Sequence, residues 1–205
     1  MNGISFRRLK IVIKSHGYSI QSFAAECGVS PNRISMICND VSIPKTDFVA
    51  KMCSILKVYP SEIVCFDGIK LNDRYFNDDM KQPLPEEAEG NVTYKPLFMF
   101  LVDYLADYNF DHDTNKTEND LFNQIEPPRR VKGIKSEVQK YAKKSVESRY
   151  GKGYKSQRES RTDYSKGLPA ITRTKLRNDR PLNLAVIYEI CKKLGCPVDF
   201  VMGYK

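Results

Sequence analysis

The chain lacks several features that define large classes of proteins. It has no apolar run of about 18 residues, the length that crosses a bilayer, so we expect no membrane-spanning segment. Its first residues, which include the basic pair Arg7 and Arg8, lack the apolar centre of a secretory signal peptide. Tryptophan is absent, which by itself excludes nothing. We therefore expect a protein that stays in the cytoplasm.

Histidine is also scarce, with only His16 and His112, which leaves few candidates for acid–base catalysis. No nucleophile with a base and no carboxylate pair stands out, so we expect neither enzymatic activity nor a cofactor. No two cysteines form the Cys-x-x-Cys pair typical of zinc sites. We expect small buried hydrophobic residues, with structural zinc as the alternative, at the six cysteines Cys27, Cys38, Cys53, Cys65, Cys191 and Cys196.

The net charge of +8 is distributed unevenly along the chain. Residues 1–66 carry 8 basic and 4 acidic side chains, for a net charge of +4. Residues 67–128 carry 5 basic and 14 acidic side chains, for a net charge of −9. Residues 129–180 carry 17 basic and 5 acidic side chains, for a net charge of +12. An acidic segment between two basic ones predicts two units that face nucleic acid, separated by a segment that does not contact phosphate.

Residues 19–35 have the pattern of two short helices joined by a tight turn. The first helical run ends at Gly28, and the small Ala24 four residues earlier allows two helices to cross closely. Ser30 can cap the second helix, and Pro31 suits its first position, where a backbone N–H has no helical partner. This pattern predicts a helix-turn-helix, whose second helix can lie in the major groove of DNA.

Three further helices are predicted around this motif, which together make one compact helical domain over residues 1–66. Apolar spacing places them at residues 5–15, from Thr46 or Asp47 to Leu56, and at residues 60–64.

The middle of the chain divides into a polar and an apolar part. Residues 67–93 are rich in Asn, Asp and Glu and contain Pro83 and Pro85, which predicts an acidic linker. Residues 96–108 predict a strongly apolar helix, which must be buried. It can form the core of its own domain or contact a second subunit, and the residues alone leave both open.

The last forty residues repeat features of the first domain. The Asn-Asp pair at 178–179 repeats the pair at 39–40, and the Cys-x-x-Leu step at 191–194 repeats the step at 53–56. These repeats indicate internal duplication, with a second, divergent helix-turn-helix-like domain over residues 94–205.

Two arrangements remain open for the first two helices of this second domain. They can lie at residues 134–149 and 157–166. Alternatively, residues 96–108 are the first helix, and the basic segment is an insertion. Residues 150–161 are basic and aromatic, and they predict either an arm that orders against phosphates or an ordinary surface loop.

These residues resemble the Cro/C1-type helix-turn-helix family, also called the lambda-repressor-like or XRE family. The resemblance covers residues 5–66 and, in part, residues 167–203. Its most specific element is the spacing from Ala24 through Gly28 to Ile34. It implies an all-α fold with two lambda-repressor-like helix-turn-helix units, joined by the acidic linker and the apolar helix.

The resemblance also implies that one face of the third helix contacts bases. There Asn32 can pair with adenine, Arg33 with guanine, and Met36 with a thymine methyl. The family usually has Gln at the first position of the second helix, where this chain has Ile20. The full set of expected DNA contacts is Ser19, Gln21, Ser30, Pro31, Asn32, Arg33, Ser35, Met36 and Asn39 in the first unit, and Thr172, Arg173, Thr174, Lys175 and Arg177 in the second.

We therefore expect a sequence-specific regulator of transcription, a repressor of a prokaryote or mobile element that binds double-stranded operator DNA and associates with the nucleoid. Modules of this family usually pair, so a homodimer is expected. A single chain whose two unlike units span adjacent sites is the alternative. A different hypothesis is an antitoxin-like or accessory protein, which binds DNA with its helix-turn-helix and a protein partner through residues 96–108.

The basic C-terminal segment generates a first prediction. Replacing the lysines between residues 132 and 158 with alanine should weaken binding to all duplexes alike. It should also flatten the salt dependence by about 0.9 logarithmic units for each phosphate that is no longer bound. Fluorescence anisotropy at several salt concentrations measures both effects, and an unchanged salt slope would contradict the prediction.

Overall fold

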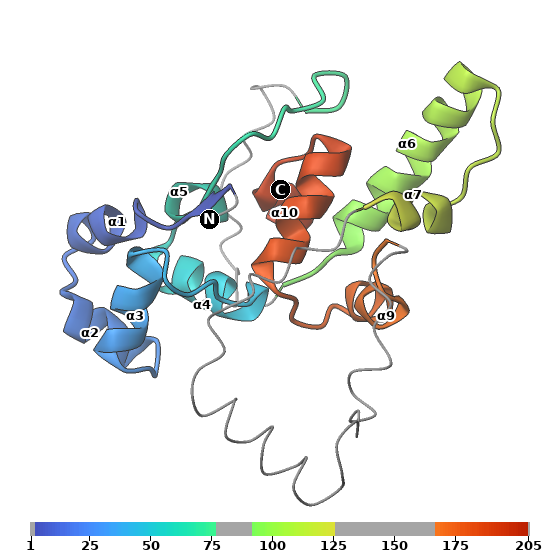
Figure 1. The fold of residues 1–205 in the computed structure, drawn as a ribbon. Helices are drawn as coiled ribbons and strands as arrows, with labels where there is room; N and C mark the ends of the chain where they lie inside the picture. The colour runs from blue at the N-terminus through green and yellow to red at the C-terminus, as the bar shows by residue number, and fades with distance from the viewer. Residues whose placement is uncertain (1–2, 77–91, 126–166, 205) are drawn as a thin grey trace, which may run out of the picture.

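The computed structural model describes residues 3–76, 92–125 and 167–204. Regular structure in these residues is mostly helical, as the sequence predicts (Figure 1). The exception is a short antiparallel sheet, in which β1 (Ile4–Ser5) pairs with β2 (Cys65–Phe66). We call residues 4–66 the N-terminal unit, and the described residues from 92 onward the C-terminal group.

The helices of the N-terminal unit follow the predicted order. They are α1 (Leu9–Ser15), α2 (Ile20–Glu26), α3 (Pro31–Cys38), α4 (Thr46–Leu56) and α5 (Pro60–Ile63).

The predicted start of the first helix at Ser5 is wrong, because Ile4 and Ser5 form β1 and residues 7–8 form a turn before Leu9. Ser5 belongs to β1, and its hydroxyl donates to Oδ2 of Asp40 over 3.0 Å. The backbone N–H of Phe6 donates to Oδ1 of the same carboxylate over 2.6 Å. These bonds to the residue pair that follows α3 leave the helix to begin at Leu9.

The C-terminal group contains α6 (Lys95–His112), α7 (Glu118–Gln124), α9 (Ala170–Arg177), α10 (Leu184–Leu194) and α11 (Val198–Val201). The helices predicted at 134–149 and 157–166, and the basic segment 150–161, lie outside the described residues. In the described residues α6 comes before α7, and the basic segment lies between α7 and α9 in the sequence.

One apolar side of α6 packs within this chain. Leu97, Phe100 and Leu101 are buried in a hydrophobic core that includes side chains from both the N-terminal unit and the C-terminal group. One side of residues 96–108 thus lies in a core shared by both halves, while Met99 and Val102 on another side are exposed.

Part of the predicted linker is packed rather than free. Within residues 67–76, the ring of Phe76 is buried and lies 5.0 Å from the ring of Phe200, centroid to centroid. The N–H of Asn72 donates to the carbonyl of Gly195 over 2.8 Å. This first part of the segment thus lies against the C-terminal group, while residues 77–91 are outside the described ranges.

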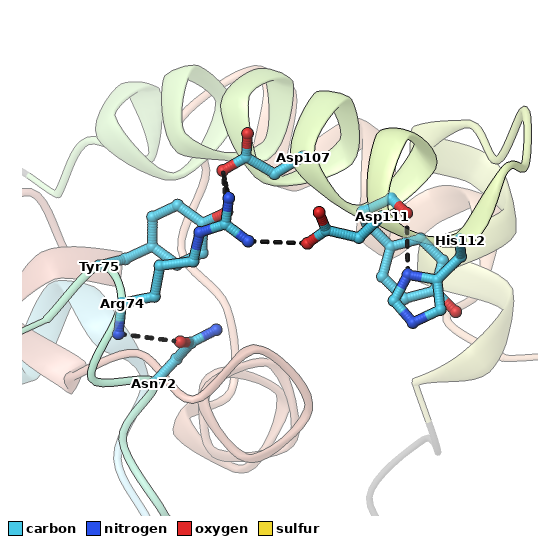
Figure 2. Close-up of polar contacts among 7 residues, drawn as sticks. Asn72, Arg74, Tyr75, Asp107, Asp111 and His112 are labelled. Atoms are coloured by element: carbon cyan, nitrogen blue, oxygen red, sulfur yellow. Dashed lines mark hydrogen bonds and ion pairs between the residues drawn. The ribbon is translucent and has the colours of Figure 1, made fainter.

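Arg74 forms ion pairs that join the same segment to the C-terminal half of α6 (Figure 2). Its guanidinium lies 3.2 Å from the carboxylate of Asp107 and 2.8 Å from that of Asp111. The hydroxyl of Tyr75 also donates to Asp107. Because these groups are partly exposed, solvent weakens each ion pair, and the buried ring of Phe76 is the main anchor.

The two halves are joined by backbone and side-chain hydrogen bonds at the starts of α4 and α10, which we call the seam. The N–H of Thr46 donates to the carbonyl of Leu182 over 2.9 Å, and the N–H of Leu184 donates to the carbonyl of Pro44 over 3.4 Å. The fully buried hydroxyl of Thr46 accepts from the N–H of Leu182 over 3.0 Å. It also shares a 2.9 Å hydrogen bond with the hydroxyl of Tyr94.

The cysteines are largely interior side chains, as expected. Cys65 is half-buried, and the other five are buried and free. Burial raises the pKa of Cys27 to about 11, so its thiol stays protonated at neutral pH. These side chains therefore act as small apolar residues.

The seam predicts a large effect from a small change at Thr46. In Thr46→Val the shape is kept, but the buried N–H of Leu182 and the hydroxyl of Tyr94 lose their partner. The free energy of unfolding should fall by about 1–3 kcal/mol in urea denaturation. The matched variant Thr46→Ser keeps the hydroxyl and loses one methyl, which should cost about 0.8 kcal/mol. A Val variant no less stable than the Ser variant would contradict this role.

A second prediction concerns Asp199, which accepts from the N–H of Ser61 over 2.8 Å between α11 and α5. Burial raises the pKa of this carboxyl above its usual value, and the bonds from Ser61 oppose the shift only in part. Because the folded state then holds a proton more readily, Asp199 favours folding in acid, and this contribution is lost as the pH rises through its folded-state pKa.

Asp199→Asn keeps an acceptor for Ser61 and removes the charge. The stability of this variant relative to the parent should therefore increase from about pH 4 to about pH 7, as measured by denaturation at several pH values. Asp199→Ala, which removes the acceptor, should be less stable than the Asn variant throughout. A difference between Asn variant and parent that does not change with pH would refute the prediction.

Candidate nucleic-acid interface

The turn between α2 and α3 is fixed by local hydrogen bonds. Gly28 has φ +66°, a backbone conformation that L side chains rarely adopt. The next residue, Val29, donates its N–H to the carbonyl of Ala24 over 2.9 Å, which draws the chain back onto α2. Ser30 then caps α3 by accepting from the N–H of Arg33, and Pro31 occupies the first helical position. The helix-turn-helix predicted from these residues is present.

α3 has one buried and one exposed side. Ile34, Ile37 and Cys38 are buried against the rest of the unit. The opposite side is exposed and carries most of the predicted base-facing residues, while Ser35 is half-buried. The exposed residues are Pro31, Asn32, Arg33, Met36 and Asn39.

Arg33 is positioned by an aromatic ring on the next helix. Its guanidinium lies over the ring of Phe48 in α4, 4.8 Å from the centroid. Such cation–π contacts contribute about 0.5–1 kcal/mol at exposed sites. A contact through the face of the guanidinium leaves its N–H donors free to pair with guanine O6 and N7.

The structure adds two cations that the sequence reasoning missed. An open depression of about 800 Å³ lies between α3 and α4, and its lining includes Arg33, Lys45, Phe48 and Lys51. Both lysines are exposed. Lys45 lies directly before α4 in an extended backbone, and Phe48 and Lys51 are three residues apart within α4, so the spacing of Phe48 and Lys51 could have identified Lys51. Lysines beside a base-facing helix are suited to contact phosphate.

The first residues of α2 and its cap differ in how far their side chains are available to DNA. Ser19 and Ser22 form a reciprocal capping box, so the hydroxyl of Ser19 is used within the protein. Ile20 is half-buried and packs against the core. Gln21 is exposed, as expected for a residue predicted to contact the DNA backbone.

The predicted contacts of the second unit all lie on or at the end of α9, but two of them are engaged elsewhere. Arg173 donates to Oδ1 of Asn119 over 3.1 Å, and Arg177 donates to Oε1 of Glu118 over 2.8 Å. Both partners lie at the start of α7. Of the remaining residues, Thr172 is half-buried, while Thr174 and Lys175 are exposed.

The two sets of predicted contacts are therefore not brought into one cluster. Figure 1 places α3 and α9 on opposite sides of the helices α4 and α10 that form the seam. Each helix carries its own exposed face, and nothing in the residue pattern indicated that Arg173 and Arg177 would be tied to α7.

Comparison with known protein families identifies the N-terminal unit. Residues 9–63 match the family model described as helix-turn-helix. The N-terminal unit is a Cro/C1-type helix-turn-helix domain. No curated protein and no solved structure matches the chain.

The helix-turn-helix domain indicates a DNA-binding regulator of transcription. Families of this kind are generally not enzymes. Within the described ranges, no three His, Cys, Asp or Glu side chains gather as a potential metal site. None of the helices described there is both long and apolar enough to cross a membrane.

The position of Arg33 on this helix-turn-helix domain yields a prediction for base preference. Arg33→Ala should relax the preference at one base pair and cost about 1–3 kcal/mol on the favoured duplex, because one bidentate pair of hydrogen bonds is removed. Fluorescence anisotropy with single-base-pair variants of that duplex measures this preference. Lys193→Ala is the matched control, since it removes one exposed positive charge from the last turn of α10. An Arg33 variant that weakens every duplex equally would contradict base contact.

Proposed function

We propose that this protein is a sequence-specific repressor that binds double-stranded operator DNA through α3. The observation that carries the proposal is the exposed side of α3, where Asn32, Arg33 and Met36 stand on a helix fixed by a capped turn. Amide, guanidinium and thioether side chains provide three kinds of contact with base edges in the major groove. Lys45 and Lys51 lie beside them for phosphate contact.

Repression would need no activity beyond this geometry. A chain that holds a promoter site in the major groove prevents another protein from occupying the same base pairs. Specific DNA-binding proteins are typically about 10³–10⁷-fold tighter on their site than on random duplex, which is enough to compete at a promoter.

The first test is selection of duplexes from a random pool with the full chain, followed by anisotropy on the selected and the random sequence. We expect the selected duplex to bind at least about 10³-fold more tightly. Equal affinity for the two would overturn sequence-specific binding. A reporter driven by a promoter containing the selected site then tests the direction of regulation. Reduced output supports repression, and increased output would replace the repressor with an activator.

A second candidate function is supported by the outer side of α6. Met99, Val102 and Phe110 are exposed to 67%, 69% and 88%, and exposed Ala106 lies between the last two at helical spacing. This apolar stripe fits an accessory protein that binds DNA with α3 and a protein partner with α6. Val102→Lys with Phe110→Lys should then abolish co-purification of a stoichiometric partner and leave DNA affinity unchanged. A chain that purifies alone from its native cell would remove this candidate.

A further inference from the structure

Several hydrogen bonds of the N-terminal unit recur at corresponding places in the C-terminal group. The first involves the Asn-Asp pair that follows α3 and the Asn-Asp pair that follows α9. Asp40 lies two residues beyond the end of α3 and has φ +58°, and Asp179 lies two residues beyond the end of α9 and has φ +49°. Oδ1 of Asp40 accepts from the N–H of Phe6, and Oδ1 of Asp179 accepts from the N–H of Tyr94, in both cases over 2.6 Å. In each case the aspartate fastens the chain that leads into the first helix.

The turn before the third helix is repeated as well. Gly167 has φ +75° and lies three residues before α9 begins, as Gly28 lies three residues before α3. The N–H of Leu168 donates to the carbonyl of Phe122 over 3.0 Å, and Phe122 lies two residues before the end of α7. Ala24, the corresponding acceptor, lies two residues before the end of α2. The chain between Ile125 and Gly167 is thus inserted into this turn.

The two halves meet with the reciprocity of a symmetric pair. The N–H that begins α4 bonds to the carbonyl two residues before α10, and the N–H that begins α10 bonds to the carbonyl two residues before α4. The residues between, Lys45 and Asn183, pair with each other in an antiparallel bridge. Ser61 and Asp199, the second residues of α5 and α11, are also hydrogen-bonded to each other. Contact between corresponding residues is what a two-fold relation requires.

This arrangement covers, within one chain, the surfaces that two separate copies would use to pair. The core is continuous across both halves, and the seam contains the fully buried side chains of Thr46 and Tyr94. A second copy could not occupy these surfaces without breaking the seam.

The exposed faces of the two third helices are not alike. Counted from the two glycines, Asn32, Arg33 and Met36 of α3 correspond to Ile171, Thr172 and Lys175 of α9. An amide and a guanidinium are replaced by an apolar side chain and a hydroxyl, and the thioether is replaced by an ammonium. Two helices with these side chains would favour different base sequences if both contacted DNA.

We propose that one chain acts as an internal dimer and binds a single duplex at two unlike half-sites, one contacted by α3 and the other by α9. This inference rests on the proposed function, and it assigns DNA binding to α9 and an asymmetric, non-palindromic site to the protein. The half-sites lie about one helical turn, roughly 34 Å, apart on one side of the duplex. A homodimer is not required.

The experiment combines the duplex selected by the full chain with the mass of the complex by native mass spectrometry. The expected result is a non-palindromic sequence and one chain per duplex. A palindromic sequence bound by two chains would overturn the internal dimer and leave the proposed function intact. Selection of no sequence above random would remove the proposed function, and this inference with it.

Variants of the two helices then test the assignment of half-sites. Arg33→Ala should reduce discrimination about 5- to 150-fold at one position in one half-site, and Lys175→Ala should do so only in the other. Lys193→Ala should leave both half-sites unchanged. A selected sequence whose preferences are all insensitive to Lys175→Ala would refute DNA contact by α9. Circular dichroism and urea denaturation confirm that each variant is folded.

Discussion

The buried hydroxyl of Thr46 joins the two halves of this protein. It accepts from the backbone of Leu182 and bonds to the hydroxyl of Tyr94, which is itself completely buried. Burial raises the pKa of Tyr94 to about 12, so its proton remains available for this bond at any physiological pH. Because unpaired polar groups in such a position are costly, these bonds hold the starts of α4 and α10 in one register. The positions of α3 and α9 depend on that register.

The same scaffold carries different chemistry on its two outer sides. In the N-terminal unit, Ile34 and Cys38 bury α3 against its neighbours. The corresponding positions in α9 are Arg173 and Arg177, whose guanidinium groups bond to the start of α7 instead. Polar contacts with α7 thus take the place in α9 of the apolar packing seen in α3. Leu176 is the one buried side chain of α9. A repeated framework with a changed outer face is consistent with two halves that bind different base sequences.

Features formed by neighbouring residues could be predicted from the sequence. Contacts between distant segments could not. Gly28 and Ser30, which caps α3, predict the turn of the first unit from the sequence because they act on neighbouring residues. The Asn-Asp pair at 178–179 indicated the repeat. The helices before this pair were harder to place, because the insertion separates Ile125 from Gly167. The two ends of the turn between α7 and α9 are therefore far apart in the sequence. The bond of Arg173 to α7 depends on how two distant segments pack, and sequence spacing carries no information about that.

Hydroxyl-radical footprinting of one chain on its selected duplex tests the internal dimer most directly. We expect two protected patches of unlike sequence, about one helical turn apart and on the same side of the duplex, at one chain per duplex. A single protected patch at that stoichiometry, or two identical patches that appear only when a second chain binds, would contradict it.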